Sequence, residues 1–447
     1  MKFKKATIII SFLLISVIAV NKLIEKRTYL YFEDFLSSSQ RVFIKKYLQP
    51  YKYISKQQKI ITNHYSMESD FKELGSDILV GKMKEKKLSD NKIMKRYNLV
   101  NGFYLGMNKV FPGSGFIDFD EENLLVLSSR GVLGYTNNLE NELSFKQIKN
   151  NIDQYINIDQ FLKNRSFSLK DLLISGEKIF VSYSEEIKDD CWNTSIIMGD
   201  MDYNNIDFKK LFSANECVHS FKNRDRAFHP HPAGGRIVAI DNDHVVLTIG
   251  PYRSRFLAQD PKSVNGKLIK VNINNSNYEI ISMGHRNPQG LYFDKENNFL
   301  LETEHGPQGG DEINLIEIDN ESKDKIPNYG WAIASAGEHY GGKIPRNKEK
   351  YLKYPLYKSH SKHGFIEPLK SFVPSIGISE ITKIENYKYV VSSLKDRSLY
   401  FFELKDRKIS SLKRVEVSER VRDLRFKNNK LFLFLEETPS IGIIDLE

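Results

Sequence analysis

The sequence predicts an all-β fold, a six-bladed β-propeller, on three observations. Beyond about residue 97, apolar and polar residues alternate with the period of two that is typical of β-strands. An apolar run, a polar turn and a second apolar run recur there, which is the pattern of a β-hairpin. Such repeats are typical of propeller blades, because one blade cannot bury its own faces alone. Six hairpins start near residues 116, 172, 237, 291, 381 and 424.

The N-terminus has the features of an export signal. The basic stretch MKFKK is followed by fifteen predominantly apolar residues, ATIIISFLLISVIAV, the order found in a signal peptide or a short membrane anchor. Fifteen residues extend for about 22 Å as a helix, less than the roughly 30 Å hydrocarbon core of a bilayer. We assign residues 1–24 to a signal peptide or membrane anchor and leave its cleavage open.

Residues 25–96 carry apolar residues at intervals of three and four, which predicts a helical, basic juxtamembrane segment. Residues 1–100 hold 20 Lys and Arg against 9 Asp and Glu, whereas the rest holds 46 against 48. Because the net charge of +9 is concentrated beside the predicted anchor, it indicates a solvated face or attraction to anionic lipid, not a nucleic-acid groove. The propeller, residues 97–447, is expected outside the cytoplasm, membrane-anchored or, after cleavage, secreted or periplasmic.

Only two cysteines occur, Cys191 and Cys217. They bracket a segment that reads as a strand, a turn rich in Asn and Asp, and a returning strand. In an exported protein this arrangement favours a disulfide that clamps a hairpin. Two buried free thiols are the alternative.

Donor-rich motifs cluster around the predicted fourth hairpin and recur near the C-terminus. GHRNPQGL precedes the inner strand of the fourth blade, EHGPQGGDEINL follows that hairpin, and NYGW comes soon after. Two later stretches, SSLKDRSLYFFEL and ERVRDLRF, contribute Lys395, Arg420 and Arg422. Loops at one end of a propeller channel gather residues that are distant in sequence, so these motifs can converge.

In this order the motifs resemble those of the soluble glucose and aldose sugar dehydrogenases that use pyrroloquinoline quinone (PQQ) on a six-bladed propeller. The resemblance covers roughly residues 110–447. It implies that Arg286 and Asn287 polarise the quinone oxygens and that Lys395, Arg420 and Arg422 hold carboxylates. This fits the chemistry of PQQ, since three carboxylates and an ortho-quinone require fixed cations and planar donors.

The resemblance also implies calcium. Gly306 and Pro307 would offer backbone carbonyls to an ion bound with the cofactor, while Glu312 and Tyr329 match a second, structural position. Hard oxygen ligands of this kind suit Ca²⁺.

For catalysis, the resemblance implies His231, in HPHPAGGRIV, as the base that takes the proton from the C1 hydroxyl, with Arg286 beside it; His229 is a weaker substitute. The family places an aspartate at the end of the same hairpin to orient this histidine. Pro251 stands at that position here, and Asp241, Asp243 and Asp260 are the nearby carboxylates. NRSFSLKDLL also lacks the family's early glutamine, and Val373 replaces a tryptophan that often precedes Pro-Ser-Ile.

Two functions follow. The first is an exported or membrane-tethered PQQ-dependent dehydrogenase that oxidises the C1 hydroxyl of an aldose, with a small sugar and an electron acceptor as partners. The alternative is a non-catalytic propeller that binds a glycan, an anionic ligand or a protein partner. A histidine metal site is a third possibility, although the spacings match no zinc pattern; its candidates are His229, His231, His285 and His305.

Overall fold

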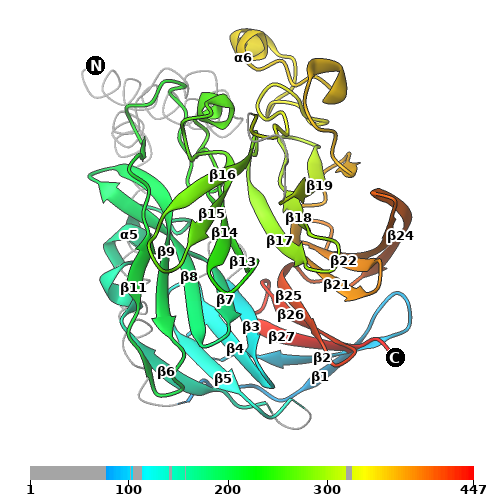
Figure 1. Ribbon diagram of the computed structural model, residues 1–447. Helices are drawn as coiled ribbons and strands as arrows, with labels where there is room; N and C mark the ends of the chain where they lie inside the picture. Colours follow the sequence, from blue (N-terminus) through cyan, green and yellow to red (C-terminus); the bar gives the residue numbers. More distant parts are fainter. Residues whose placement is uncertain (1–76, 101, 104–112, 140–142, 157, 319–324) are drawn as a thin grey trace, which may run out of the picture. The chain divides into compact units, whose positions relative to one another are not determined.

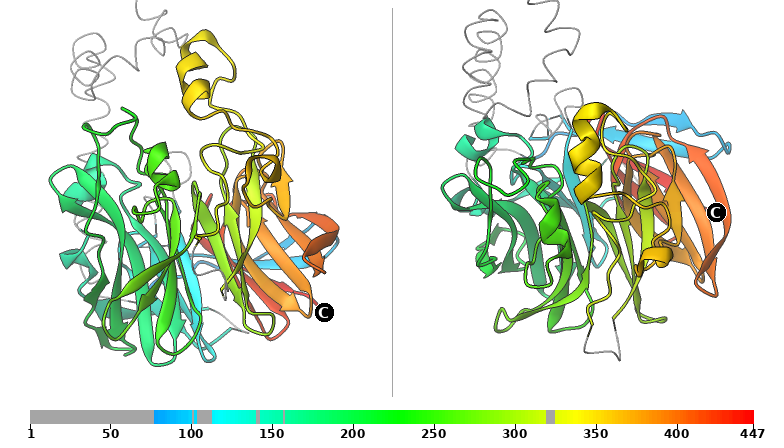
Figure 2. Two further views of the ribbon diagram at one scale, coloured as in Figure 1. Left: turned by 45° about the horizontal axis from the view of Figure 1, so that its top comes forward. Right: turned by 90° about the horizontal axis from the view of Figure 1, so that it is seen from above.

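The computed structural model describes residues 77–447 except 101, 104–112, 140–142, 157 and 319–324. Within this part the chain forms six sheets of four or five strands each, antiparallel apart from one short parallel pairing at the edge of the first sheet (Figures 1 and 2). The innermost strands of successive sheets contact one another, and that of the last sheet contacts that of the first. This closed ring confirms the six-bladed propeller.

Each predicted hairpin is the inner pair of strands of one blade. The strands turn at polar or glycine-containing sequences, and their burial patterns show apolar side chains enclosed on the inner strands. In chain order the pairs are β3 (Gly115–Asp120) and β4 (Asn123–Ser128), β7 (Leu169–Ser175) and β8 (Lys178–Lys188), β13 (Gly234–Ala239) and β14 (His244–Ile249), β17 (Pro288–Asp294) and β18 (Phe299–Glu304), β21 (Ile378–Glu385) and β22 (Lys388–Ser393), and β25 (Val421–Lys427) and β26 (Lys430–Leu435).

The outer strands complete the blades and are more exposed. They are β5 (Leu133–Thr136), β6 (Lys146–Asn150) and β10 (Asn205–Ile206) in blade one; β9 (Cys191–Asp200), β11 (Lys209–Phe212) and β12 (Val218–His219) in blade two; β15 (Lys267–Asn272) and β16 (Tyr278–Met283) in blade three; β19 (Asp311–Glu317) and β20 (Lys370–Phe372) in blade four; and β23 (Ser398–Lys405) and β24 (Lys408–Glu416) in blade five. Apolar clusters fill the spaces between adjacent blades.

The N-terminal strands of the described part complete the sixth blade. There β2 (Ile93–Asn98) pairs with β27 (Ser440–Asp445), and β1 (Lys84–Lys87) pairs with β2. The prediction of helix through residue 96 is therefore wrong for these strands, and the propeller begins before residue 97. The turn between them contains Asn91 with a φ of 71°, and Met94 and Tyr97 are buried.

The described helices are short, and α5 (Ile158–Lys163) and α6 (Lys348–Lys353) have six residues each. In the described part of the chain, no helix has the length and apolarity needed to span a bilayer. The predicted anchor, residues 1–24, and the predicted juxtamembrane helix up to residue 76 lie outside the described residues, so these assignments remain predictions.

The predicted disulfide is present between Cys191 and Cys217, with their Cα atoms 5.3 Å apart. It ties the start of β9 to the segment that leads into β12, and Val218 pairs with Trp192 across these strands. The Trp192 ring is fully buried and stacks on Phe167 with ring centres 3.5 Å apart. The alternative of two free thiols is wrong.

Candidate active site

Five of the six inner strands share an irregularity where they enter the central channel. Their pairing shifts register between Leu169 and Asp171, Gly234 and Ile237, Pro288 and Gly290, Ile378 and Ile381, and Val421 and Asp423. A β-bulge of this kind redirects side chains and is common beside functional sites. The bulges turn polar groups toward the channel: Lys170, Asp171, Arg236, Gln289, Glu380, Arg422 and Asp423.

Arg236, on β13, contacts a residue from each of the other five blades. Its guanidinium is almost fully buried and stands among three carboxylates that could otherwise surround a metal ion. The contacts are with the Phe116 ring (5.3 Å from Cζ), Asp171 (2.8 Å), the Gln289 carbonyl (2.6 Å), Glu380 (2.8 Å) and Asp423 (3.0 Å).

The three carboxylates exceed the two arginines that face them, Arg236 and Arg425. Burial raises the pKa of Glu380 to about 8 against the opposing effect of both arginines. Burial also raises the pKa of Asp171 to about 6. For Asp423 the two arginines outweigh burial and lower the pKa. At neutral pH one of the three carboxylates is therefore protonated, and the proton is held mainly by Glu380.

Because Glu380 holds a proton in the folded protein, we expect the stability of the fold to decrease as the pH rises. The folded-state pKa of Glu380, about 8, lies above its ordinary value of 4.5, so the stabilisation is complete below the unfolded pKa and is lost as the pH rises through the folded pKa. We expect the urea midpoint to fall between pH 5 and pH 9, and to fall less in Glu380→Gln. Equal pH dependence of the midpoint in the two proteins would contradict this assignment.

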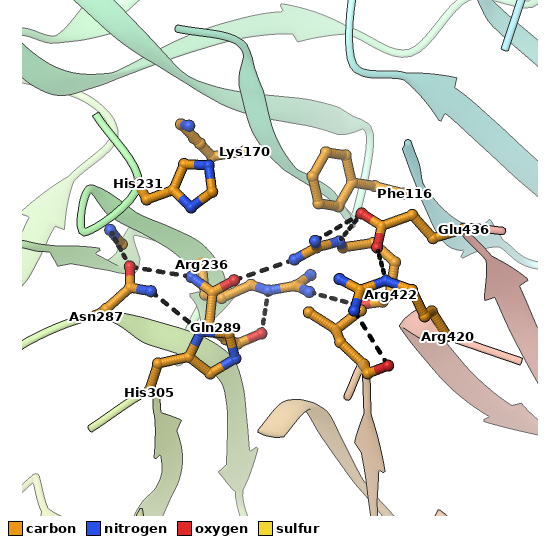
Figure 3. A pocket seen from close by; sticks show the side chains of 12 residues that line it. Phe116, Lys170, His231, Arg236, Asn287, Gln289, His305, Arg420, Arg422 and Glu436 are labelled. Atoms are coloured by element: carbon orange, nitrogen blue, oxygen red, sulfur yellow. Dashed lines mark hydrogen bonds and ion pairs between the residues drawn. The ribbon is translucent and has the colours of Figure 1, made fainter. Parts of the chain in front are cut away.

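Two adjoining cavities open at the end of the channel beyond Arg236, and Figure 3 shows the inner one. Their volumes are about 110 Å³ for the inner cavity and about 320 Å³ for the outer cavity; small-molecule sites commonly measure ~300–1,000 Å³. Both cavities are lined by His231, Asn287 and His305.

The inner cavity contains the two predicted arginines of blade six. Arg420 Nε and Arg422 Nη2 each donate to a carboxylate oxygen of Glu436 at 2.7 Å, and Arg422 Nη1 donates to Gln289 Oε1 at 3.1 Å (Figure 3). Burial opposes ionisation of Glu436, but the two guanidinium groups hold its pKa below the usual range. One carboxylate thus orients two cations, which leaves the inner cavity with excess positive charge.

Arg286 and Asn287 lie in the turn that leads into β17. Glu304 anchors this turn by accepting the backbone N–H groups of Arg286 and Asn287, at 2.5 and 3.2 Å. Arg286 Nη1 donates to the His305 carbonyl at 2.5 Å, and its Cζ lies 5.3 Å from the centre of the Trp331 ring. Both predicted side chains line the outer cavity, together with Lys395 from the end of blade five's inner hairpin.

The NYGW motif supports the GHRNPQGL turn from behind. The backbone N–H of Trp331 donates to the Gly284 carbonyl at 2.9 Å, and the Tyr329 ring stacks on His285 with centres 4.9 Å apart. Asn328 Nδ2 donates to Gln259 Oε1 at 2.8 Å. The motifs that are distant in sequence therefore meet at one place, as the sequence predicts.

His231 lies on the wall shared by the two cavities and is exposed to them. Desolvation by the surrounding protein lowers the pKa of His231 to about 4, and the positive charges of Lys170 and Arg422 are smaller causes in the same direction. His229 lines only the outer cavity, and the same kind of surroundings lowers its pKa to about 3. Both imidazoles are neutral at neutral pH but are weak proton acceptors.

In the described part of the chain, no carboxylate forms an ion pair or hydrogen bond with the His231 ring. Pro251 follows β14 and its carbonyl accepts the Ser254 N–H at 2.6 Å. Asp241 bonds to His244 Nδ1 at 3.0 Å, and Asp243 and Asp260 accept backbone N–H groups or surface amides. None of these aspartates lines either cavity, so they do not replace the missing one.

The predicted calcium residues separate into two places. Gly306 and Pro307 line the outer cavity. The buried Glu312 carboxylate instead faces His360 Nε2 at 3.8 Å, and the Tyr329 hydroxyl donates to the Leu315 carbonyl at 2.5 Å. The first pair fits an ion held beside a ligand in the cavity. The imidazole facing Glu312 does not fit an all-oxygen calcium site.

The four candidate histidines do not converge. His229, His231 and His305 line the outer cavity, but His285 is fully buried behind it and its Nε2 bonds to Ser282 Oγ at 2.9 Å. The third possibility, a site built from all four, is not formed. Val373 is 66% exposed and lines neither cavity, so it provides no platform for a sugar.

Sequence reasoning missed the buried residues Lys170, Phe116 and Glu436 of the inner cavity. Lys170 lies in SLKDLL, where a single lysine in a strand pattern usually marks a solvated face. The bulge between Leu169 and Asp171 directs it inward. A signal existed, because a polar pair precedes the apolar inner strand in KDLL and in RDLR alike.

The fold and the site together define a class: a six-bladed propeller with a cationic cavity at one end of its channel. The family model described as Glucose / Sorbosone dehydrogenase matches residues 169–444, and the chain belongs to this family. The aldose sugar dehydrogenase YliI of Escherichia coli is 26% identical over 272 residues, 56% of this chain and 67% of that protein. Quinoprotein glucose dehydrogenase B of Acinetobacter calcoaceticus is 36% identical over 92 residues, 18% of each chain.

Solved structures support the same fold. The apo form of the soluble aldose sugar dehydrogenase from Escherichia coli aligns with a TM-score of 0.57 and 21% identity, covering 74% of this chain and 94% of that one. The PQQ-bound form of the aldose sugar dehydrogenase from Streptomyces coelicolor aligns with a TM-score of 0.53 and 17% identity, covering 79% and 98%.

Proposed function

We propose that the chain is a PQQ-dependent dehydrogenase that oxidises the C1 hydroxyl of an aldose sugar. The observation that carries this proposal is the gathering of four cations, Arg286, Lys395, Arg420 and Arg422, around two adjoining cavities at one end of the channel. These groups suit a tricarboxylate, since guanidinium and ammonium groups form the strongest hydrogen bonds with carboxylates. The relatives named for quinoprotein and aldose sugar dehydrogenase activity support the same assignment.

In this proposal each residue has a defined task. Lys395, Arg420 and Arg422 hold carboxylates, while Arg286 and Asn287 donate to the quinone oxygens. When bound, the ortho-quinone supplies an acceptor for a hydride. His231 lies where a sugar hydroxyl could enter between the two cavities, and an external electron acceptor completes turnover.

Calcium is proposed at one place only. Gly306 and Pro307 line the outer cavity, and their carbonyls would hold the ion beside the cofactor. Hard backbone oxygens are suitable ligands for Ca²⁺.

Export is part of the proposal, with residues 1–24 as signal peptide or anchor and the propeller outside the cytoplasm or in the periplasm. The Cys191–Cys217 disulfide supports this location, because disulfides persist in oxidising compartments.

The direct test uses the full chain, purified in mild detergent. PQQ and Ca²⁺ are added, binding is followed by the change in tryptophan fluorescence, and dye reduction is measured with a panel of aldoses. We expect saturable PQQ binding and aldose-dependent reduction. Absence of PQQ binding would overturn the proposal.

The alternative of a non-catalytic ligand-binding propeller is favoured by one observation: Pro251 replaces the expected aspartate, and no carboxylate in the described residues engages the His231 ring. Saturable PQQ binding without reduction of dye by any aldose would select this alternative.

A further inference from the structure

We propose that Lys170 is the group that takes the proton from the substrate hydroxyl, in the role that the family resemblance gives to His231. This inference rests on the proposed dehydrogenase function and deepens it. The reaction balances as an alcohol oxidation. The O–H bond breaks and its proton passes to the neutral Lys170 amine, giving an ammonium. The C–H bond breaks and its hydrogen leaves with the electron pair to the ortho-quinone of the cofactor, so that a carbonyl remains.

The first support is the position of Lys170. Its side chain lines the inner cavity with His231, and Figure 3 shows the two side chains next to each other. The bulge in β7 places Lys170 at the position in its strand that Gln289 and Arg422 occupy in theirs. Lys170 therefore belongs to the ring of polar residues at the channel end and not to a solvated surface.

The second support is the way the side chain is held. A Cβ atom at Gly235 would lie 2.2 Å from Lys170 Cβ, so only glycine leaves room for the lysine stem to pass. Lys170 Nζ donates to the Ser166 carbonyl at 2.5 Å. These contacts fix the amine at the cavity wall and leave its lone pair and its other N–H group for a ligand.

The third support is electrostatic. Lys170 is 8% exposed, and none of the described carboxylates forms an ion pair with Nζ. The charged or titratable groups around it are Arg422 from blade six and His229 and His231 from the segment before β13; Asp171, its neighbour in sequence, is engaged by Arg236. Burial, followed by the charge of Arg422, lowers the pKa of Lys170 to about 7.

These surroundings distinguish Lys170 from His231 as a base. A general base is most effective when its pKa is near the working pH. The pKa of His231 is lowered to about 4 and no aspartate raises it, whereas that of Lys170 is lowered to about 7. The lysine therefore offers the stronger acceptor that is still unprotonated near neutral pH.

Lys267 provides an internal comparison. Burial also lowers its pKa to about 7, but its Nζ donates to three carbonyls, those of Leu257, Ala258 and Asn265, and it lines neither cavity. A lowered pKa is therefore common to both lysines. Proton transfer also requires access to the cavity, which Lys170 has and Lys267 lacks.

The first experiment measures the amine without any turnover. The full chain, free of cofactor, is briefly treated with acetic anhydride at pH 5.5 to 9, and labelling of each lysine is quantified by mass spectrometry. We expect Lys170 to react with a midpoint near pH 7 and Lys267 to stay unlabelled because it is enclosed. Exposed lysines, with an ordinary pKa of ~10.4, should still gain reactivity at pH 9. A Lys170 that remains protonated throughout would overturn the proposal.

The second experiment measures catalysis in the loaded protein. Lys170→Met should lower kcat by about 10²–10⁴-fold, the usual contribution of a general base, and remove the acid limb of the kcat/KM profile near pH 7. Lys170→Arg should not restore activity, since guanidinium stays protonated. Ethylamine added to Lys170→Ala should restore part of kcat. Lys178→Met, at the opposite end of the same hairpin, is the matched control and should behave as the parent protein.

The outcomes separate the two levels of inference. If the parent protein neither binds PQQ nor reduces dye, the proposed function fails, while the labelling result still reports on Lys170. If the parent is active and Lys170→Met keeps the acid limb with kcat within threefold, Lys170 is not the base. A rise in KM confined to acidic sugars, with kcat unchanged, would make Lys170 an anion-binding residue and equally overturn the proposal.

Discussion

Replacing Arg236 by methionine is expected to lower the free energy of unfolding by about 3–5 kcal/mol, the usual cost of removing one member of a buried ionic network. Arg236 is 3% exposed and contacts a residue from each of the other five blades. Its loss would leave Asp171, Glu380 and Asp423 facing one another with only Arg425 to compensate. Urea unfolding of the full chain, followed by circular dichroism of the strands, measures the change.

Arg414→Met is the matched control for this effect. Arg414 pairs with Asp396 on the surface of blade five and is 44% exposed, and exposed pairs contribute only about 0–1 kcal/mol. Adding Asp171→Asn and Asp423→Asn to Arg236→Met should recover part of the lost stability, because the uncompensated charges are removed. A loss no larger in Arg236→Met than in Arg414→Met would contradict the assignment of Arg236 as the link between blades.

The inner hairpins could be predicted because their signal is local. In DLRFKNNKLFLFL, apolar residues flank a turn made by Asn428 and Asn429, both with positive φ. Strand pairing across such a turn requires only neighbouring residues. Counting these units therefore predicted the number of blades correctly.

The closure of the ring could not be predicted in this way. The strand β2 pairs with β27, for example Met94 with Ile444, so its partner lies at the other end of the chain. Its lysines also resembled the polar face of a helix, since they stood among apolar residues at mixed spacings. The spacing of apolar residues alone cannot distinguish a strand from a helix when the stabilising contact is this distant in sequence.

The cationic half of the site could be predicted from motif order, because Arg286, Lys395, Arg420 and Arg422 lie at or beside the ends of inner strands whose sequences are recognisable. Lys170 could not, since a bulge shifts the alternation by one residue and a pattern of period two then assigns the wrong face. The separation of Glu312 from Gly306 and Pro307 also depends on side-chain partners, above all His360, that no spacing reveals.

Replacing Lys395 provides the sharpest test of cofactor binding. Arg420 and Arg422 already share Glu436, whereas Lys395 is exposed at the outer cavity and its ammonium has no ion pair with any described residue. It can therefore be changed without exposing a buried partner. A hydrogen bond to a charged group contributes about 1.5–3 kcal/mol, so Lys395→Met should weaken PQQ binding by about 10–100-fold.

Charge reversal should have the larger effect. Lys395→Glu both removes the attraction and places a carboxylate against those of the cofactor, and like charges across an interface cost several kcal/mol. We expect PQQ binding, measured by fluorescence titration, to weaken by about 10³-fold or more, with the urea midpoint unchanged. Lys405→Glu, at the last residue of β23 in the same blade, controls for the change in net charge. If PQQ affinity falls from the parent protein to Lys395→Met and further to Lys395→Glu, the ammonium faces an anion in the cavity. Equal affinities of all three proteins for PQQ would exclude that contact.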